Sequence, residues 1–110
     1  MVENARRQGE RALTRLREMR DAHPLIGDVR GRGLLLGIEL VTDRIAKTPA
    51  NDAAEAVLYR ALARGLSFKV SLGNVLTLTP PLIVSDHEMD LALAIVEEAI
   101  AETERELQHG

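Results

Sequence analysis

Apolar residues in three long segments of the chain return at helical steps of three or four positions. Residues 2–22 show this spacing, with arginine, glutamate and glutamine between the apolar positions. Gly9 falls on the apolar face of this segment, where a missing side chain lets a packing partner come close. Residues 50–64 and 86–107 repeat the helical spacing with alanine, leucine, valine and other aliphatic residues. We therefore predict helices near 2–22, 50–64 and 86–107.

The residues at the ends of the second and third helical segments support these boundaries. Thr48 and Pro49 suit an N-cap and a first-turn proline, and Gly65 suits a C-terminal stop. Ser85 stands three residues before Glu88, which is the spacing of a capping box. In such a box the serine hydroxyl accepts from the glutamate amide, and the glutamate side chain reaches back to the cap.

Shorter segments carry the patterns of strands. Residues 34–41 form a mostly apolar run of strand length, and residues 42–48 are polar and loop-like. In residues 67–72, apolar side chains alternate with serine and lysine, and in residues 75–79 leucine alternates with valine and threonine. The Gly-Asn pair at 73–74 fits a two-residue hairpin turn, because glycine tolerates the positive φ that such turns need. We predict strands near 34–41, 67–72 and 75–79, the last two joined as a hairpin.

The order of these elements predicts a single α+β domain over residues 1–110. The order is helix, one or two strands, helix, hairpin and helix, which places helices on a small, mainly antiparallel sheet. A chain of 110 residues is long enough for one modest core. Aromatic residues make up only 2% of the chain, so leucine, isoleucine, valine and alanine must build that core.

Composition and charge argue against several classes of partner. A net charge of −3 gives no attraction for nucleic acid or anionic membrane, and few aromatic residues leave few platforms for stacking bases. No apolar run is long enough to span a bilayer, and the N-terminus, rich in both charge signs, does not resemble a signal peptide. Without cysteine there is no disulfide frame and no thiolate metal site. We expect a cytoplasmic protein without nucleic-acid or membrane partners.

No group of side chains in the sequence assembles a catalytic or metal centre. Gly31 and Gly33 precede a predicted strand and Gly37 lies within it, whereas a phosphate-binding loop leads into a helix. These glycines favour a tight turn and a close backbone approach. His23, His87 and His109 have no partners at metal-binding spacing, so we predict no metal ligands and expect all three to face solvent. Two groups of acidic residues stand near the starts of predicted helices, where the helix dipole favours them: Asp52 with Glu55, and Asp86 with Glu88 and Asp90.

Glu39 interrupts an otherwise apolar strand. An unpaired buried carboxylate is costly. Glu39 therefore either faces solvent or pairs with an arginine such as Arg30 or Arg32, and a structural role is favoured over a substrate contact.

Two segments carry a resemblance to a known family. The first is His23-Pro-Leu-Ile-Gly-Asp-Val-Arg-Gly-Arg-Gly33, which continues as Gly37-Ile-Glu39. The second is Gly73-Asn-Val-Leu-Thr-Leu-Thr-Pro-Pro-Leu82. With Val2-Glu-Asn-Ala5 before them and the closing helix after them, they resemble the small C-terminal domain of class III, pyridoxal-phosphate-dependent aminotransferases. Among members, the chain is similar to 4-aminobutyrate aminotransferases and dialkylglycine decarboxylase-like proteins.

The resemblance implies a fold type I transaminase that moves an amino group from an amine or amino acid, such as a 4-aminobutyrate-like donor, to a 2-oxo acid. In that family pyridoxal phosphate is held by a lysine of a large upstream domain, which would be missing here, and the enzymes are homodimers. The resemblance therefore implies that residues 1–110 are a C-terminal small domain that helps close the substrate site. Neither Lys47 nor Lys69 matches the motif of the cofactor lysine. We expect no catalytic and no cofactor-binding residue here, and no transamination by this chain alone.

The resemblance also singles out Thr77 as a candidate substrate-binding position. In many relatives the residue three positions before the Pro-Pro pair is an arginine that binds the substrate carboxylate as a bidentate fork. A threonine hydroxyl does not replace that charge. The resemblance then implies either another partner for the carboxylate or an amino donor without a carboxylate near the reacting carbon. Thr77 equally suits an ordinary position in a strand.

A function of a different class is also open. A stand-alone ligand-binding or regulatory module of ferredoxin-like type would combine helices and hairpins in a similar way. Such a module would have a sealed core, whereas a small aminotransferase domain would expose an apolar face where the large domain belongs.

Overall fold

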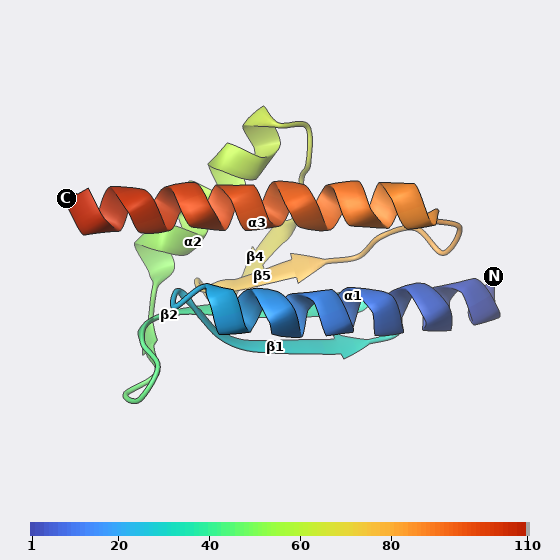
Figure 1. The fold of residues 1–110 in the computed structure, drawn as a ribbon, viewed down its shortest axis with the longest axis horizontal. Coiled ribbons are helices and arrows are strands. Elements are labelled where there is room, and N and C mark those ends of the chain that lie inside the picture. The colour runs from blue at the N-terminus through green and yellow to red at the C-terminus, as the bar shows by residue number, and fades with distance from the viewer. Residues whose placement is uncertain (110) are drawn as a thin grey trace.

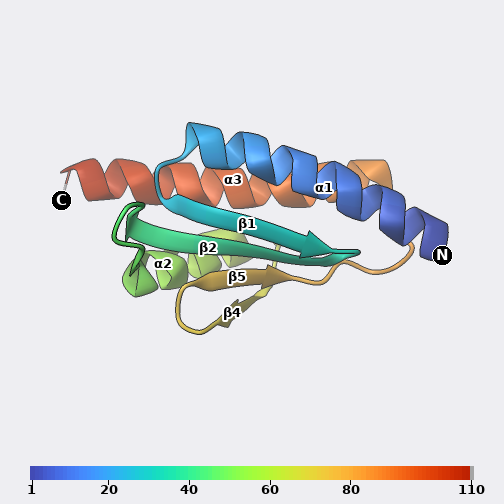
Figure 2. The same cartoon turned by 90° about the horizontal axis from the view of Figure 1, so that it is seen from below.

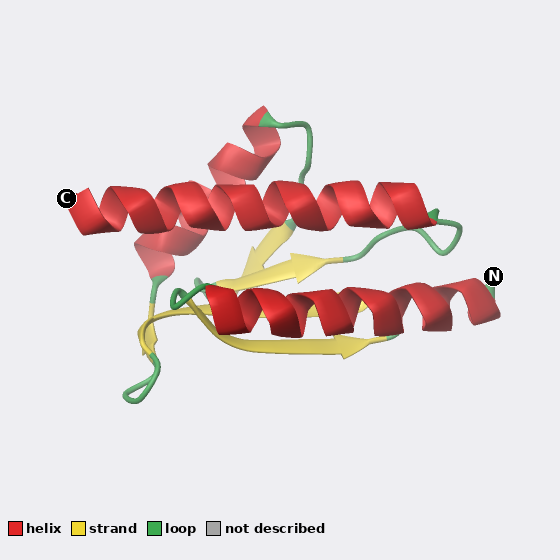
Figure 3. Cartoon of the chain, viewed as in Figure 1, coloured by secondary structure: helices red, strands yellow, loops and turns green. Residues whose placement is uncertain are grey.

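Three helices cover one face of a five-stranded sheet in the computed structural model (Figures 1 and 3). The structure describes residues 1–109, and of His109 only its place at the end of the last helix. The helices are α1 (Val2–Ala22), α2 (Asn51–Ala63) and α3 (Asp86–His109). The strands are β1 (Ile26–Arg32), β2 (Leu35–Asp43), β3 (Thr48–Pro49), β4 (Lys69–Ser71) and β5 (Val75–Leu78). The predicted α+β class and all three predicted helices are confirmed.

The strands form an antiparallel sheet in the order β1-β2-β5-β4, with β3 paired to the far end of β2 (Figure 2). The sequence left open one or two strands before α2, and the structure has β1 and β2 joined as a hairpin. Gly33 opens their two-residue turn with φ +58°, a value that glycine adopts without steric cost. The glycine-rich segment therefore makes a turn between strands, as predicted, and no phosphate loop.

The core lies between the helices and one face of the sheet. Alternate residues of the two central strands are buried there, namely Leu36, Ile38 and Leu40 of β2 with Leu76 and Leu78 of β5. The α3 residues that the sequence predicted to face inward are buried or half-buried: Met89, Ala92, Leu93, Val96, Ala99, Ile100 and Thr103. The opposite face of the sheet carries no helix, and Leu35, Glu39, Val75 and Thr77 on this face are exposed or half-buried.

Gly9 brings α1 into close contact with the β1–β2 turn. A Cβ atom at Gly9 would lie 2.1 Å from the carbonyl oxygen of Gly33, so only glycine fits between the helix and this turn. The prediction that Gly9 admits a close packing partner is confirmed. Val2, assigned by the sequence to the same buried stripe, is instead exposed.

The second helix ends as predicted but begins later. At its C-terminus, Gly65 has φ +91° and donates to the Leu62 carbonyl, while the amide of Leu66 donates to the Ala61 carbonyl, which is a Schellman motif. The N-cap is Ala50, so the prediction of Thr48 as the cap was wrong.

Thr48 and Pro49 form β3 instead. They pair with the end of β2, and the amide of Ala50 donates to the Leu40 carbonyl at 3.0 Å. A residue before proline favours extended backbone, and proline is tolerated in edge strands. Residues that the sequence assigned to the start of the helix therefore belong to the sheet.

The capping box at the start of α3 is confirmed. The amide of Glu88 donates to the Ser85 hydroxyl at 3.1 Å, and the amide of Ser85 donates to the Glu88 carboxylate at 2.9 Å. These bonds lower the pKa of Glu88. The box fixes the point at which the chain leaves its Pro-Pro segment and enters the helix.

The β4–β5 hairpin has a longer turn than predicted. Ser71 pairs with Val75, so three residues, Leu72 to Asn74, connect the strands. Both Leu72 (φ +56°) and Gly73 (φ +84°) have left-handed backbone. The Asn74 side chain is buried and donates to the Leu40 carbonyl at 3.0 Å, and the Leu40 amide donates to the Asn74 carbonyl at 2.9 Å. These bonds to β2 hold the longer loop. Leu72, which was predicted to lie in the strand 67–72, is instead exposed in this loop.

Polar contacts join α1 to the distant α3 segment. The Asn4 amide group donates to the Leu82 carbonyl at 2.9 Å, and Arg11 pairs with Asp90 at 3.0 Å. Gln8 is buried and donates to Asp86, which lowers the pKa of that carboxyl group. The two helices are therefore fixed in register along their shared length. Within the part of the chain that the structure describes, no helix is long and apolar enough to cross a membrane.

Candidate functional site

A row of four residues crosses the open face of the sheet at the level of Thr77. The register pairs Arg30 with Gly37, Gly37 with Thr77, and Thr77 with Lys69. Residues directly opposite one another in antiparallel strands point to the same face, with Cβ atoms about 4.5–5.5 Å apart. Thr77 therefore has a bare backbone on one side and a lysine on the other.

The hydroxyl of Thr77 is joined to a second hydroxyl. The Thr77 Oγ1 and Ser71 Oγ atoms lie 3.0 Å apart, close enough for either one to donate to the other. Ser71 stands two positions after Lys69 in β4, so both point to the open face. Lys69, Ser71 and Thr77 form a cluster of polar side chains from two strands, which we call the β4–β5 cluster.

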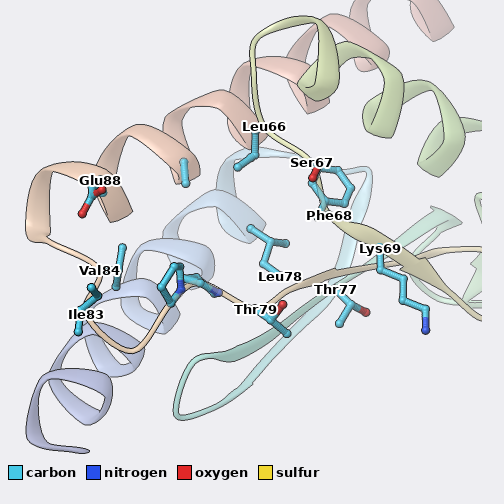
Figure 4. A pocket seen from close by; sticks show the side chains of 13 residues that line it. Leu66, Ser67, Phe68, Lys69, Thr77, Leu78, Thr79, Ile83, Val84 and Glu88 are labelled. Carbon is cyan, nitrogen blue, oxygen red and sulfur yellow. The ribbon is translucent and has the colours of Figure 1, made fainter. Parts of the chain in front are cut away.

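Two hollows meet at Thr77. The larger, of about 490 Å³, lies between the β4–β5 hairpin and the start of α3 (Figure 4). Mostly apolar side chains line it, Phe68, Leu78 and Ile83 among them, and Thr77 and Lys69 stand at one end. The smaller, of about 340 Å³, lies over the open sheet face between Arg30 and Thr77. Both hollows are open to solvent, so a bound molecule could reach Thr77 from either.

The carboxylates near these hollows are already engaged. Arg30 forms an ion pair with Glu39, which confirms the prediction that Glu39 pairs with a neighbouring arginine. Glu88, which lines the larger hollow, is bonded to Ser85 in the capping box. Among residues 1–109, no carboxylate forms an ion pair with Lys69. The β4–β5 cluster thus has a positive charge with no internal counterion.

The structure corrects the prediction for His23. Its side chain is only 13% exposed and lies between two carboxylates of α3, with Nδ1 2.7 Å from Glu104 and Nε2 2.9 Å from Glu97. Burial opposes the charged imidazolium, but hydrogen bonds and charge from these carboxylates outweigh it and raise the pKa of His23. The carboxylates approach opposite nitrogens of the ring, so they do not converge on one point as metal ligands would. His87 is exposed as expected, and the side chain of His109 lies outside the description.

The sequence singled out Thr77 as a candidate and did not place Lys69 and Ser71 beside it. A signal was present in the strand pattern. Phe68 and Val70 belong to the core side of the hairpin with Leu76 and Leu78. That matching of faces requires an odd number of residues in the turn, and the three-residue turn that the structure has places Lys69 opposite Thr77.

Comparisons with known proteins identify the family of the chain. The family described as "Aminotransferase class-III" matches residues 1–100. A Vibrio splendidus protein named (R)-1-hydroxy-2-aminoethylphosphonate ammonia-lyase is 53% identical over 104 residues, which are 93% of this chain and 22% of that protein. A taurine–pyruvate aminotransferase of Bilophila wadsworthia is 37% identical over 96% of this chain and 25% of its own length.

Solved structures show the same relation. The ω-transaminase of Pseudomonas jessenii in complex with PMP matches with a TM-score of 0.90 and 30% identity, over 99% of this chain and 24% of that one. The chain thus spans about a quarter of the length of these relatives. Since the family match extends over nearly all of the sequence, the chain belongs to the class-III aminotransferase family.

Proposed function

We propose that residues 1–110 are the C-terminal small domain of a pyridoxal-phosphate-dependent transaminase, which moves an amino group from an amine or amino acid to a 2-oxo acid. The observation that carries this proposal is the family match over residues 1–100. The position of Thr77, where two open hollows meet, supports a role for this domain in forming the substrate site. We propose Thr77 as the residue of this domain that faces the substrate.

The same proposal places the residues that hold the cofactor outside residues 1–110. Lys47 stands in an exposed turn with φ +57°, and Lys69 stands in the β4–β5 cluster beside open hollows. Neither is enclosed as a cofactor anchor would be. In the proposed enzyme the large domain holds pyridoxal phosphate, which acts as the electron sink, and the small domain helps close the substrate site. A homodimer and a cytoplasmic location belong to the same proposal.

An assay of the complete gene product tests this function. The protein would be purified with pyridoxal phosphate and given pyruvate and a panel of amines that includes 4-aminobutyrate, with alanine measured by chromatography. We expect alanine that depends on both the amine and the cofactor. Residues 1–110 produced alone should form none. If the complete protein binds no cofactor and forms no alanine with any donor, the stand-alone ligand-binding module becomes the better account.

A second reaction within the family is favoured by one comparison. The relative with 53% identity is named an ammonia-lyase, and a lyase would release ammonia from its amine without a 2-oxo acid. Incubating the complete protein with (R)-1-hydroxy-2-aminoethylphosphonate and no acceptor separates the two reactions. Free ammonia under these conditions would support the lyase, whereas ammonia-free turnover that requires pyruvate would support the transaminase.

A further inference from the structure

We propose that the β4–β5 cluster binds a tetrahedral oxyanion, the phosphonate or sulfonate group of the amine substrate, with Lys69 supplying the charge. This inference rests on the function proposed above. It assigns to this domain a specificity-determining residue, Lys69, that neither the family pattern nor the sequence reasoning singled out.

The charge of Lys69 supports this proposal. Two carboxylates of the neighbouring elements are occupied, because Glu39 pairs with Arg30 and Glu88 caps α3. Lys69 has no ion-pair partner in the described part of the chain, although the chain carries a net charge of −3. An exposed ammonium group beside an apolar hollow attracts an anion more strongly than one in open water, because the apolar wall lowers the local dielectric.

The arrangement of hydrogen-bond donors in the β4–β5 cluster supports it as well. Lys69 lies directly across from Thr77 in the sheet. The hydroxyl oxygens of Ser71 and Thr77 lie 3.0 Å apart. One hydroxyl of this pair donates to the other, which leaves the proton of the second hydroxyl free for a ligand. The ammonium group adds up to three further donors. The cluster therefore offers several N–H and O–H groups from two strands to one anion.

The shape of the anion follows from the donor types. A planar carboxylate is matched by the planar fork of an arginine, whereas lysine acts as a point charge without a preferred plane. Arg30, the arginine in the same row, is committed to Glu39. A point charge with a hydroxyl suits a group whose oxygens point in three directions, as those of phosphonates and sulfonates do. Two relatives are named for such amines, an aminophosphonate and taurine, an aminosulfonate.

The first test compares substrates that differ only in their acidic group. The complete holoenzyme, wild type and Lys69→Met, would be assayed with 2-aminoethylphosphonate, taurine, β-alanine and propylamine, which has no acidic group. Loss of a charge-assisted hydrogen bond predicts that kcat/KM for the phosphonate and the sulfonate, relative to propylamine, falls about tenfold or more. Lys69→Arg should restore part of this ratio. Lys47→Met is the matched control, because it removes the other lysine of the chain from an exposed turn and should leave the ratio unchanged.

Three outcomes of this assay would overturn the proposal. They are an unchanged ratio in Lys69→Met, a loss confined to β-alanine, and a reduced cofactor content in the variant. The last would assign Lys69 to the phosphate of the cofactor. Circular dichroism of the variant checks that the fold is retained.

The second test needs no turnover and therefore separates this proposal from the proposed function. Lysines of the wild-type protein would be acetylated with and without ethylphosphonate, and the peptides that contain Lys69 and Lys47 would be quantified by mass spectrometry. We expect ethylphosphonate to slow acetylation of Lys69 and not that of Lys47. Acetylation of Lys69 at the same rate with and without ethylphosphonate would contradict the proposal. Slower acetylation with inorganic phosphate but not with ethylphosphonate would also contradict it and would indicate a site for free phosphate.

Discussion

His23 connects the end of α1 to a carboxylate pair more than seventy positions further along the chain. Glu97 also pairs with Arg15, and Glu104 also accepts from the backbone amide of Leu25 at 3.1 Å. The imidazole is therefore part of a network that joins α1, the start of β1 and α3. Because the pKa of His23 is raised on folding, this network makes stability depend on pH.

We predict that the stabilising effect of His23 is largest in mild acid. Its folded pKa lies above the ordinary value of 6.5, so its contribution is complete below pH 6.5 and is lost as pH rises through the folded value. The free energy of unfolding of wild type and His23→Gln would be measured by urea titration from pH 5.5 to 8.5. The difference should shrink as pH rises. A difference that is constant with pH would show that the ring acts through packing alone.

Leu72 has left-handed backbone and no compensating burial. Its side chain is 91% exposed, and non-glycine residues with such a φ carry strain of about 1 kcal/mol or more. Asparagine tolerates this conformation better than leucine. We predict that Leu72→Asn raises the free energy of unfolding by about 0.5–1 kcal/mol. Ile45→Asn is the control, because Ile45 is equally exposed and has no positive φ, and it should change little.

Among the elements, α3 depends most clearly on a local signal. Removing the serine hydroxyl leaves one amide of the first turn without its partner, so Ser85→Ala should lower the free energy of unfolding by about 1 kcal/mol. Ser67→Ala serves as control, since that exposed serine forms no side-chain hydrogen bond in the described residues. Equal midpoints for Ser85→Ala and wild type in thermal denaturation would mean that packing of α3, and not its cap, sets its start.

The elements show how far the sequence could be interpreted. Periodicity identified all three helices and the hairpin, because those signals lie within each segment. The turn at 73–74 was given one residue too few, because the bonds that set its length come from Leu40 in another strand. A two-residue turn at 73–74 would shift the register by one residue and place Val70, not Lys69, opposite Thr77. The pairing of Lys69 with Thr77 was therefore not predicted. Likewise, Thr48 belongs to β3 because it pairs with β2, and local propensity does not predict that pairing.

At the scale of the whole molecule, one side of the domain is left incomplete. Ile83 is exposed at the edge of the 490 Å³ hollow, Leu82 next to it in the chain is exposed as well, and Leu35 is exposed on the open sheet face. Exposed apolar residues beside an apolar hollow are typical of a surface that another domain covers. In the proposed enzyme the large domain covers it.

We therefore predict that residues 1–110 produced alone bind a dye for apolar surface and elute as a species heavier than 12.1 kDa. The double variant Leu82→Ser, Ile83→Ser should reduce both effects. Ile45→Ser should not, because that exposed residue lies in the turn before β3, outside both hollows. A monomer without dye binding would favour a self-sufficient module.

The contacts between α1 and α3 also set an order of events during synthesis. The partners of Asn4, Gln8 and His23 lie 78 to 81 positions further along the chain. At about 5–20 residues per second, a ribosome needs on the order of 4–16 seconds to make that stretch. The β1–β2 hairpin can form meanwhile and α1 can pack on it, but the polar side chains of α1 that contact α3 stay without these partners until α3 is made. Within this domain, α1 is therefore the segment whose contacts are completed last.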